Sequence, residues 1–217
     1  MVKIFNFDNE TIDNNEFSSN SYVIGEQNGP CIIVDLGSTN KRIIDYIKKN
    51  HTSVLGILLT HGHFDHIRGL NNFLKEFNAT IFIYETENEF LLNSRLNRSK
   101  NHAEDVVVET ENIYLVDDED EINFGNQIYV KVIHTPFHTS GSVCFLIKSE
   151  NALFTGDTLF KGSIGRTDLP TGNEKEVYSS LSKIKQLNEN YTIYPGHGEI
   201  TTLFNELKNN YYLKKEN

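Results

Sequence analysis

This sequence of 217 residues has few cysteines, no long apolar run and no basic-then-apolar N-terminal segment, and each of these absences disfavours a class of protein. The two cysteines, Cys31 and Cys144, lie in apolar, strand-like runs and fit neither a disulfide framework nor a cysteine-based zinc pattern. We expect both to be buried free thiols, as in a reducing compartment. No apolar run approaches the roughly 18 residues of a membrane-spanning helix. The N-terminal residues lack a basic segment followed by an apolar one, so we expect a cytoplasmic protein that does not associate with membranes.

Basic charge is also scarce. The chain has 20 lysines and arginines against 30 aspartates and glutamates, a net charge of −10, and its basic residues are scattered. This pattern disfavours a nucleic-acid-binding surface. A chain of this length can form a core without disulfides or metals, so a bound metal would serve chemistry. We find no internal repeat and no linker, and we predict one domain over residues 1–217.

Apolar runs and turn residues predict two groups of strands, each accompanied by helices. The predicted strands are 2–7, 21–25, 30–35, 54–59 and 80–84 in the first group and 113–116, 127–133, 142–148, 151–155 and 191–194 in the second. Helices are predicted at 43–50, from about His66, at 174–187 and at 202–213, with weak helical character in 86–111 and a solvated loop at 117–121. This arrangement indicates an α+β protein with two sheets and helices outside them.

Polar side chains crowd the stretch Thr-His-Gly-His-Phe-Asp-His at 60–66, directly after the apolar run 54–59. If this turn stays extended, His61 and His63 point to the same side, and Asp65 and His66 can approach the same place. So many imidazoles in one turn have little structural use without a cation, which predicts a metal site. Taken singly, Asp65 could instead be a helix N-cap, and each histidine an ordinary polar residue.

Further donors follow other predicted strands: His138, Asp157 and His197. Loops at the carboxyl ends of strands are where sites assemble in sheet-based enzymes. Together with the 60–66 stretch they supply five imidazoles and two carboxylates, enough for two ions if one carboxylate and one water bridge them. Asp157 alone could be only a turn residue. His134 is a weaker candidate because Pro136 prevents a regular helical pair with His138, and we expect His51 and His102 at the surface.

Four motifs in this order resemble those of the metallo-β-lactamase superfamily: His-Gly-His-Phe-Asp-His at 61–66, His-Thr-Pro-Phe-His-Thr-Ser-Gly-Ser at 134–142, Phe-Thr-Gly-Asp at 154–157 and Tyr-Pro-Gly-His-Gly at 194–198. The resemblance covers nearly the whole chain. It implies an αββα sandwich of two mixed sheets with helices on the outer faces. It also implies that His61, His63 and His138 hold one metal, that Asp65, His66 and His197 hold a second, and that Asp157 bridges them.

Within the superfamily, the chain resembles the glyoxalase II-like (hydroxyacylglutathione hydrolase-like) hydrolases. This resemblance implies hydrolysis of a small-molecule thioester, such as S-(2-hydroxyacyl)glutathione or a related acyl-thiol, by a hydroxide that bridges two divalent metals. Zinc is the first expectation, with iron or manganese as alternatives, because all three suit imidazole and carboxylate ligands. Asp65 could also relay a proton. We expect a monomer or a small homo-oligomer.

Two departures leave the substrate open. Glyoxalase II carries a C-terminal helical domain that helps bind glutathione, whereas here only 199–217 follow the last motif. The loop 162–170 lies where glyoxalase II has a lysine that contacts glutathione. Arg166 in this loop could take that role by binding a substrate carboxylate, or it could pair with Asp168. The segment Gly-Arg-Thr-Asp also resembles that of persulfide dioxygenases, which use one iron held by two histidines and an aspartate. Lactone hydrolysis and RNA processing, which related members perform, are further alternatives, and the acidic charge disfavours the second. We do not expect β-lactam hydrolysis.

Overall fold

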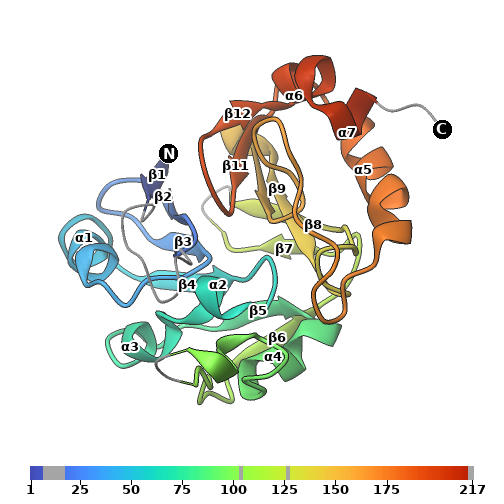
Figure 1. Cartoon of the computed structure of the whole chain (residues 1–217). Helices are drawn as coiled ribbons and strands as arrows, with labels where there is room; N and C mark the ends of the chain where they lie inside the picture. The colour runs from blue at the N-terminus through green and yellow to red at the C-terminus, as the bar shows by residue number, and fades with distance from the viewer. Residues whose placement is uncertain (7–17, 103–104, 126–127, 215–217) are drawn as a thin grey trace. The chain divides into compact units, whose positions relative to one another are not determined.

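The computed structural model describes residues 1–6, 18–102, 105–125 and 128–214. The chain divides into two compact units, Met1–Leu115 and Val116–Asn217. Each unit has its own six-stranded sheet, and in Figure 1 the first unit runs from blue to green and the second from yellow-green to red. The two predicted groups of strands therefore form two sheets, except that the strand at 113–116, predicted in the second group, belongs to the first sheet. None of the helices in the described ranges is long and apolar enough to cross a membrane.

The sheet of the first unit has the order β1-β2-β3-β4-β5-β6. Its strands β1 to β3 pair in antiparallel fashion, whereas β3, β4 and β5 run parallel, so the sheet is mixed. The central strands β3 and β4 consist mostly of buried apolar residues, as expected for strands covered on both faces. The bounds are β1 Val2–Phe5, β2 Ser21–Gly25, β3 Cys31–Val34, β4 Val54–Leu58, β5 Ile81–Tyr84 and β6 Ile113–Val116.

The helices of the first unit are α1 Arg42–Asn50, α2 Phe64–Ile67, α3 Leu70–Leu74, η1 Glu85–Glu87, α4 Asn88–Leu92 and η2 Ser99–Asn101. One helix was predicted from about His66, but two short helices are present and the first begins at Phe64. The chain breaks between them because Gly69 passes close to another loop: its N–H donates to the carbonyl of Leu36 at 2.7 Å. A Cβ at Gly69 would lie 2.3 Å from the carbonyl oxygen of Ser38. Residues 103 and 104 of the weakly helical stretch lie outside the described residues.

The sheet of the second unit has the order β12-β11-β10-β9-β8-β7. All neighbours pair in antiparallel fashion except β10 and β11, which run parallel and end together, with the N–H of Gly196 donating to the carbonyl of Gly156. The bounds are β7 Glu121–Asn123, β8 Tyr129–His134, β9 Val143–Ile147, β10 Ala152–Gly156, β11 Thr192–Pro195 and β12 Thr201–Thr202. The short strands β7 and β12 were not predicted, and Glu121 belongs to β7 instead of a loop. Residue 127 of the predicted strand 127–133 lies outside the described residues.

The helices of the second unit are η3 Lys148–Glu150, η4 Glu174–Glu176, α5 Val177–Lys185, α6 Leu203–Asn209 and α7 Tyr211–Lys214 (Figure 1). Apolar residues of α5, α6 and α7 pack with those of the sheet in one core cluster. The predicted terminal helix is two helices because Asn210 leaves the helical conformation, and its side-chain amide donates to the carbonyl of Ser163 and to Glu206.

Both cysteines are free and buried, as predicted. Burial raises the pKa of Cys31 to about 12 and that of Cys144 to about 11. Neither thiol is therefore poised as a nucleophile or as a metal ligand.

Candidate metal centre

In the first unit, the turn after β4 gathers four polar side chains, as the sequence predicts. His61, His63 and His66 are 1%, 2% and 0% exposed. The ring nitrogens Nε2 of His61 and Nδ1 of His63 lie 3.0 Å apart, so these two side chains share a side of the chain as expected. The ring centroids of His61 and His66 are 4.1 Å apart, and Asp65 Oδ2 lies 3.7 Å from His66 Nε2.

Asp65 is not a helix N-cap. The residue at that position of α2 is His63, and no side chain caps the helix. Asp65 lies inside the first helical turn, and its own carbonyl accepts the N–H of Ser19 at 3.0 Å. The local alternative for Asp65 is thus excluded by the backbone.

Asp35, a carboxylate that the sequence analysis did not single out, orients this cluster through hydrogen bonds to Thr60 and His66. It follows β3, is 1% exposed, and has a left-handed backbone with φ of 55°. Its oxygens accept the N–H and the hydroxyl of Thr60 at 2.9 and 2.8 Å and the ring Nδ1 of His66 at 2.8 Å. An Nδ1–H held by a carboxylate leaves the lone pair on Nε2 for a metal. Asp35 stands at a strand end like the other candidates, and that signal could have identified it.

In the second unit, the structure brings His138, Asp157 and His197 together from three loops. Oδ2 of Asp157 lies 3.4 Å from Nε2 of His138, and Oδ1 of the same carboxylate lies 3.8 Å from Nε2 of His197. The two oxygens of Asp157 therefore face two different histidines. This arrangement is more than a turn residue requires.

His138 is oriented by the main chain. Its Nδ1 lies 2.9 Å from the carbonyl oxygen of Arg166, so Nδ1–H donates there and Nε2 keeps its lone pair toward Asp157. The loop reaches this position only with a glycine before Arg166. A Cβ at Gly165 would lie 2.0 Å from the carbonyl oxygen of Asp157 and 3.1 Å from Nδ1 of His138.

The distances between donor atoms within each unit fit those between ligands of a divalent metal ion. Two ligand atoms on a tetrahedral ion with bonds of about 2.1 Å lie about 3.4 Å apart. The separations of 3.0 and 3.7 Å in the first unit and of 3.4 Å in the second are close to this value. Imidazole nitrogens with carboxylate oxygens suit zinc, iron and manganese alike, so the donors favour a metal without selecting one.

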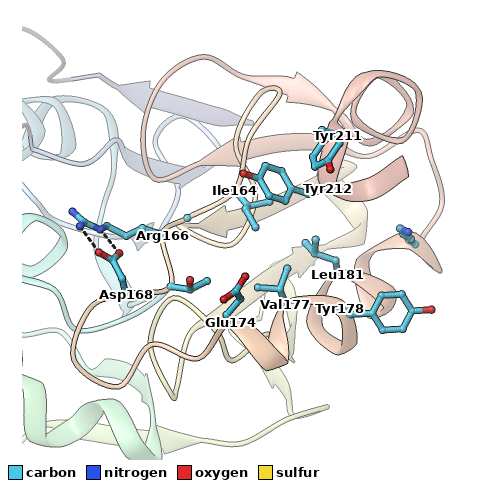
Figure 2. Close-up of a pocket in the computed structure, with 12 residues that line it drawn as sticks. Ile164, Arg166, Asp168, Glu174, Val177, Tyr178, Leu181, Tyr211 and Tyr212 are labelled. Atoms are coloured by element: carbon cyan, nitrogen blue, oxygen red, sulfur yellow. Dashed lines mark hydrogen bonds and ion pairs between the residues drawn. The ribbon is translucent and has the colours of Figure 1, made fainter. Parts of the chain in front are cut away.

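The side chain of Arg166 pairs with Asp168, whereas its main-chain carbonyl holds the His138 ring. Its guanidinium forms two hydrogen bonds of 2.7 Å to the Asp168 carboxylate, with both side chains mostly exposed. The pair lies at one end of a pocket of about 590 Å³ in the second unit, shown in Figure 2. Other parts of the wall come from α5 and α7 and include Val177, Tyr178, Leu181, Tyr211 and Tyr212.

The remaining histidines lie elsewhere. His134 places Nε2 2.9 Å from the carbonyl oxygen of Ser140, inside its own loop. His51 and His102, expected at the surface, are partly buried: the His51 ring lies 5.6 Å from that of Tyr46, and the His102 ring stacks on Phe64 at 4.3 Å.

Comparisons with known proteins identify the family. The model of the metallo-beta-lactamase superfamily matches residues 14–197, a range that contains all seven candidate ligands. The chain therefore belongs to the metallo-β-lactamase superfamily. It is 33% identical to the probable metallo-hydrolase YqgX of Bacillus subtilis over 184 residues, 84% of this chain and 87% of that protein. It is 30% identical to the hydroxyacylglutathione hydrolase GloC of Haemophilus influenzae over 212 residues, 95% of this chain and 98% of that protein.

Among solved structures, the B3 metallo-β-lactamase BLEG-1 is similar with a TM-score of 0.87 and 30% identity, covering 99% of this chain and 100% of that one. The expected fold class, the α+β sandwich of the metallo-β-lactamases with two mixed sheets and helices, is confirmed. Family and relatives together make this protein a metallo-hydrolase of that superfamily.

Proposed function

We propose that the protein hydrolyses thioesters, such as S-(2-hydroxyacyl)glutathione or a related acyl-thiol, with two divalent metal ions. In this proposal both units form one hydrolase domain. His61, His63 and His138 hold one ion, Asp65, His66 and His197 hold the other, and Asp157 bridges them. The observation that carries the proposal is the Asp157 carboxylate, whose two oxygens face His138 and His197 separately. A carboxylate that bridges two ions through its two oxygens would have that geometry.

The chain's own groups prepare the site for this chemistry. When bound, two dications would lower the pKa of a shared water and polarise the substrate carbonyl. Asp35 and the carbonyl of Arg166 fix His66 and His138 with Nε2 free, so these rings bind without reorientation. Asp65, whose side chain is 17% exposed, is the proposed proton relay. A thiolate leaves readily because thiols have pKa values of about 8.5.

Arg166 is the proposed contact for the substrate. GloC, to which the chain is similar over nearly its full length, is named for hydrolysis of hydroxyacylglutathione, and such substrates carry carboxylates. Asp168 already presents a carboxylate to Arg166 through two hydrogen bonds. We propose that a substrate carboxylate takes the place of Asp168, since the guanidinium binds any carboxylate in the same forked geometry.

The first experiment is metal analysis of protein purified without added metal, combined with activity assays. The substrates are S-lactoylglutathione for thioester hydrolysis, glutathione persulfide for oxygen uptake, and nitrocefin for β-lactam hydrolysis. We expect about two ions per chain and thioester hydrolysis. A single iron with oxygen uptake and no hydrolysis would replace the proposal with a persulfide dioxygenase. Nitrocefin turnover without thioester turnover would replace it with a β-lactamase, the activity named for BLEG-1.

A further inference from the structure

Behind the metal-binding turn of the first unit lies a segment that the proposed chemistry does not use. Its described residues are 85–102, with η1, α4 and η2, and 105–108, and it contacts the turn at Gly62 and Phe64. The N–H of Gly62 donates to Oε2 of Glu87 at 2.8 Å, and the N–H of Phe64 donates to the carbonyl of Asn97 at 2.9 Å. These two N–H groups flank His63 on either side. The segment therefore holds both peptide groups next to one candidate ligand.

Glu87 is the charged member of this arrangement. Its side chain is 0% exposed, although it stands in a short 3-10 turn beside the exposed Glu85. Burying a carboxylate costs free energy unless hydrogen bonds and positive charge offset the lost hydration. An ordinary surface turn has no use for such a group, so its burial against the ligand turn needs a specific reason.

The contact between turn and segment is close. A Cβ at Gly62 would lie 2.4 Å from Cβ and 2.9 Å from Cγ of Phe90. The glycine allows α4 to press on the turn, and the ring of Phe90 lies 6.1 Å from that of His63. The backbone of Gly62 is thus confined by packing on one side and by the Glu87 carboxylate at its N–H.

Asn97, which accepts the N–H of Phe64, is also held in place by hydrogen bonds. Asn97 is 0% exposed, and its side-chain amide donates to the carbonyls of Phe90 and Val106, each at 2.8 Å. Its own carbonyl is thereby fixed in the position where it accepts the N–H of Phe64. Glu87 and Asn97 together fix the backbone on both sides of His63 through two hydrogen bonds.

We propose that Glu87 is a positioning residue of the metal centre: by fixing the Gly62 N–H it sets the approach of His61 Nε2 to His63 Nδ1, and its charge favours a cation there. This inference rests on the proposed metal assignment. It assigns a role to Glu87 in the stretch 86–111, for which the sequence predicts only weak helical character. A carboxylate acceptor is suited to it because charge-assisted hydrogen bonds are about twice as strong as neutral ones.

The test compares two conservative variants with a matched control. Glu87→Gln keeps the size and an oxygen acceptor but removes the charge, whereas Glu87→Asp keeps the charge but withdraws the carboxylate from Gly62. Glu85→Gln removes the same charge from the exposed face of the same turn. For each protein, zinc affinity is measured by competition with a chelating dye, the visible spectrum is recorded with cobalt, and the melting temperature is measured without metal.

We expect zinc affinity to fall about 10- to 100-fold in Glu87→Asp, the usual loss for a group that orients a ligand. Glu87→Gln should lose roughly 3- to 10-fold, with a shifted cobalt spectrum, because its hydrogen bond persists but weakens. Glu85→Gln should match the parent. If Glu87→Asp does not fold, unchanged affinity and spectrum in Glu87→Gln overturn the proposal.

Two other results also overturn it: a larger loss in Glu87→Gln than in Glu87→Asp, which would leave only charge, or a lowered melting temperature with unchanged affinity, which would leave only a structural role. Turnover of S-lactoylglutathione by the parent is recorded separately. A parent that binds zinc but does not hydrolyse the thioester contradicts the proposed substrate and leaves the role of Glu87 intact.

Discussion

The two units supply metal-binding groups in different ways. The first unit places four donors within six consecutive residues at the end of β4, whereas the second takes one donor from each of three loops. The orienting groups differ as well: a buried side chain, Asp35, holds His66, and a main-chain carbonyl, that of Arg166, holds His138. The ligands of the first unit form a local motif of the sequence. The group that orients a ligand can be either a side chain or a main-chain carbonyl, so substitutions should affect the two units differently.

The largest effect is expected from one ligand in each unit. His61→Ala and Asp157→Ala should each lower kcat/KM for thioester hydrolysis roughly 10³-fold or more, since each removes metal-dependent stabilisation of several kcal/mol. Metal content should fall in parallel. His51→Ala, in the first unit but against Tyr46, is the control and should keep full activity. Folded ligand variants that retain parental turnover would exclude the metal assignment.

The next largest effect is expected from replacing Asp35, the side chain that orients His66. Asp35→Asn should weaken zinc affinity about 10- to 100-fold, because an amide replaces the carboxylate that accepts from both Thr60 and His66. Asparagine tolerates the left-handed backbone at φ of 55°, so the variant separates the side-chain effect from backbone strain. Dye competition measures the affinity, and a parental value would mean that Asp35 only joins two loops.

The main-chain carbonyl of Arg166, which orients His138, cannot be removed by substitution. It can be displaced by a larger residue at the preceding position. Gly165→Ala should weaken zinc affinity about 10-fold, because the new Cβ would clash with the carbonyl of Asp157 and move the Arg166 carbonyl from His138. Gly162→Ala is a matched control in the same loop: φ is +73° and nothing lies within 4 Å of its Cβ. It should cost about 1 kcal/mol of stability from backbone strain and leave affinity unchanged. Equal affinities of the two variants would contradict this role of Gly165.

The smallest effect concerns the base of the loop that carries His138. Asp118 accepts the N–H of His134 at 2.8 Å and the ammonium of Lys183 at 2.7 Å. Partial burial opposes ionisation of Asp118, but these hydrogen bonds outweigh it and hold its pKa below the usual value. Its contribution to stability is therefore complete above about pH 4, the pKa of an unfolded aspartate, and is lost as the pH falls below that.

The measurement is the melting temperature of metal-free parent and Asp118→Asn between pH 7 and pH 3. The difference should be largest at neutral pH, should shrink below about pH 4, and should amount to only a few degrees because both side chains are about one-third exposed. A difference that does not change with pH would show that the charge of Asp118 contributes nothing.

Much of the fold follows from apolar periodicity. The strands β2, β4, β5, β9 and β10 lie within about one residue of their predicted ends, because short buried runs bounded by turn residues have few alternatives. The short strands β7 and β12 carry too few residues to show alternation. The helix after the metal-binding turn was predicted whole because its apolar spacing continues, and it breaks only where Gly69 meets the loop at Leu36 and Ser38.

The sequence by itself determined the family and which side chains are candidate ligands, since a cluster of imidazoles after a buried strand is a local feature of the chain. Tertiary structure decided which groups hold those ligands. Asp35, Glu87, Asn97 and the carbonyl of Arg166 are distant in sequence from the rings and peptides they fix, by 31, 25, 33 and 28 residues. Hydrogen bonds over such separations depend on how strands and loops pack. A local pattern can mark Asp35 as a carboxylate at a strand end, but it does not show which ring or peptide group each residue holds.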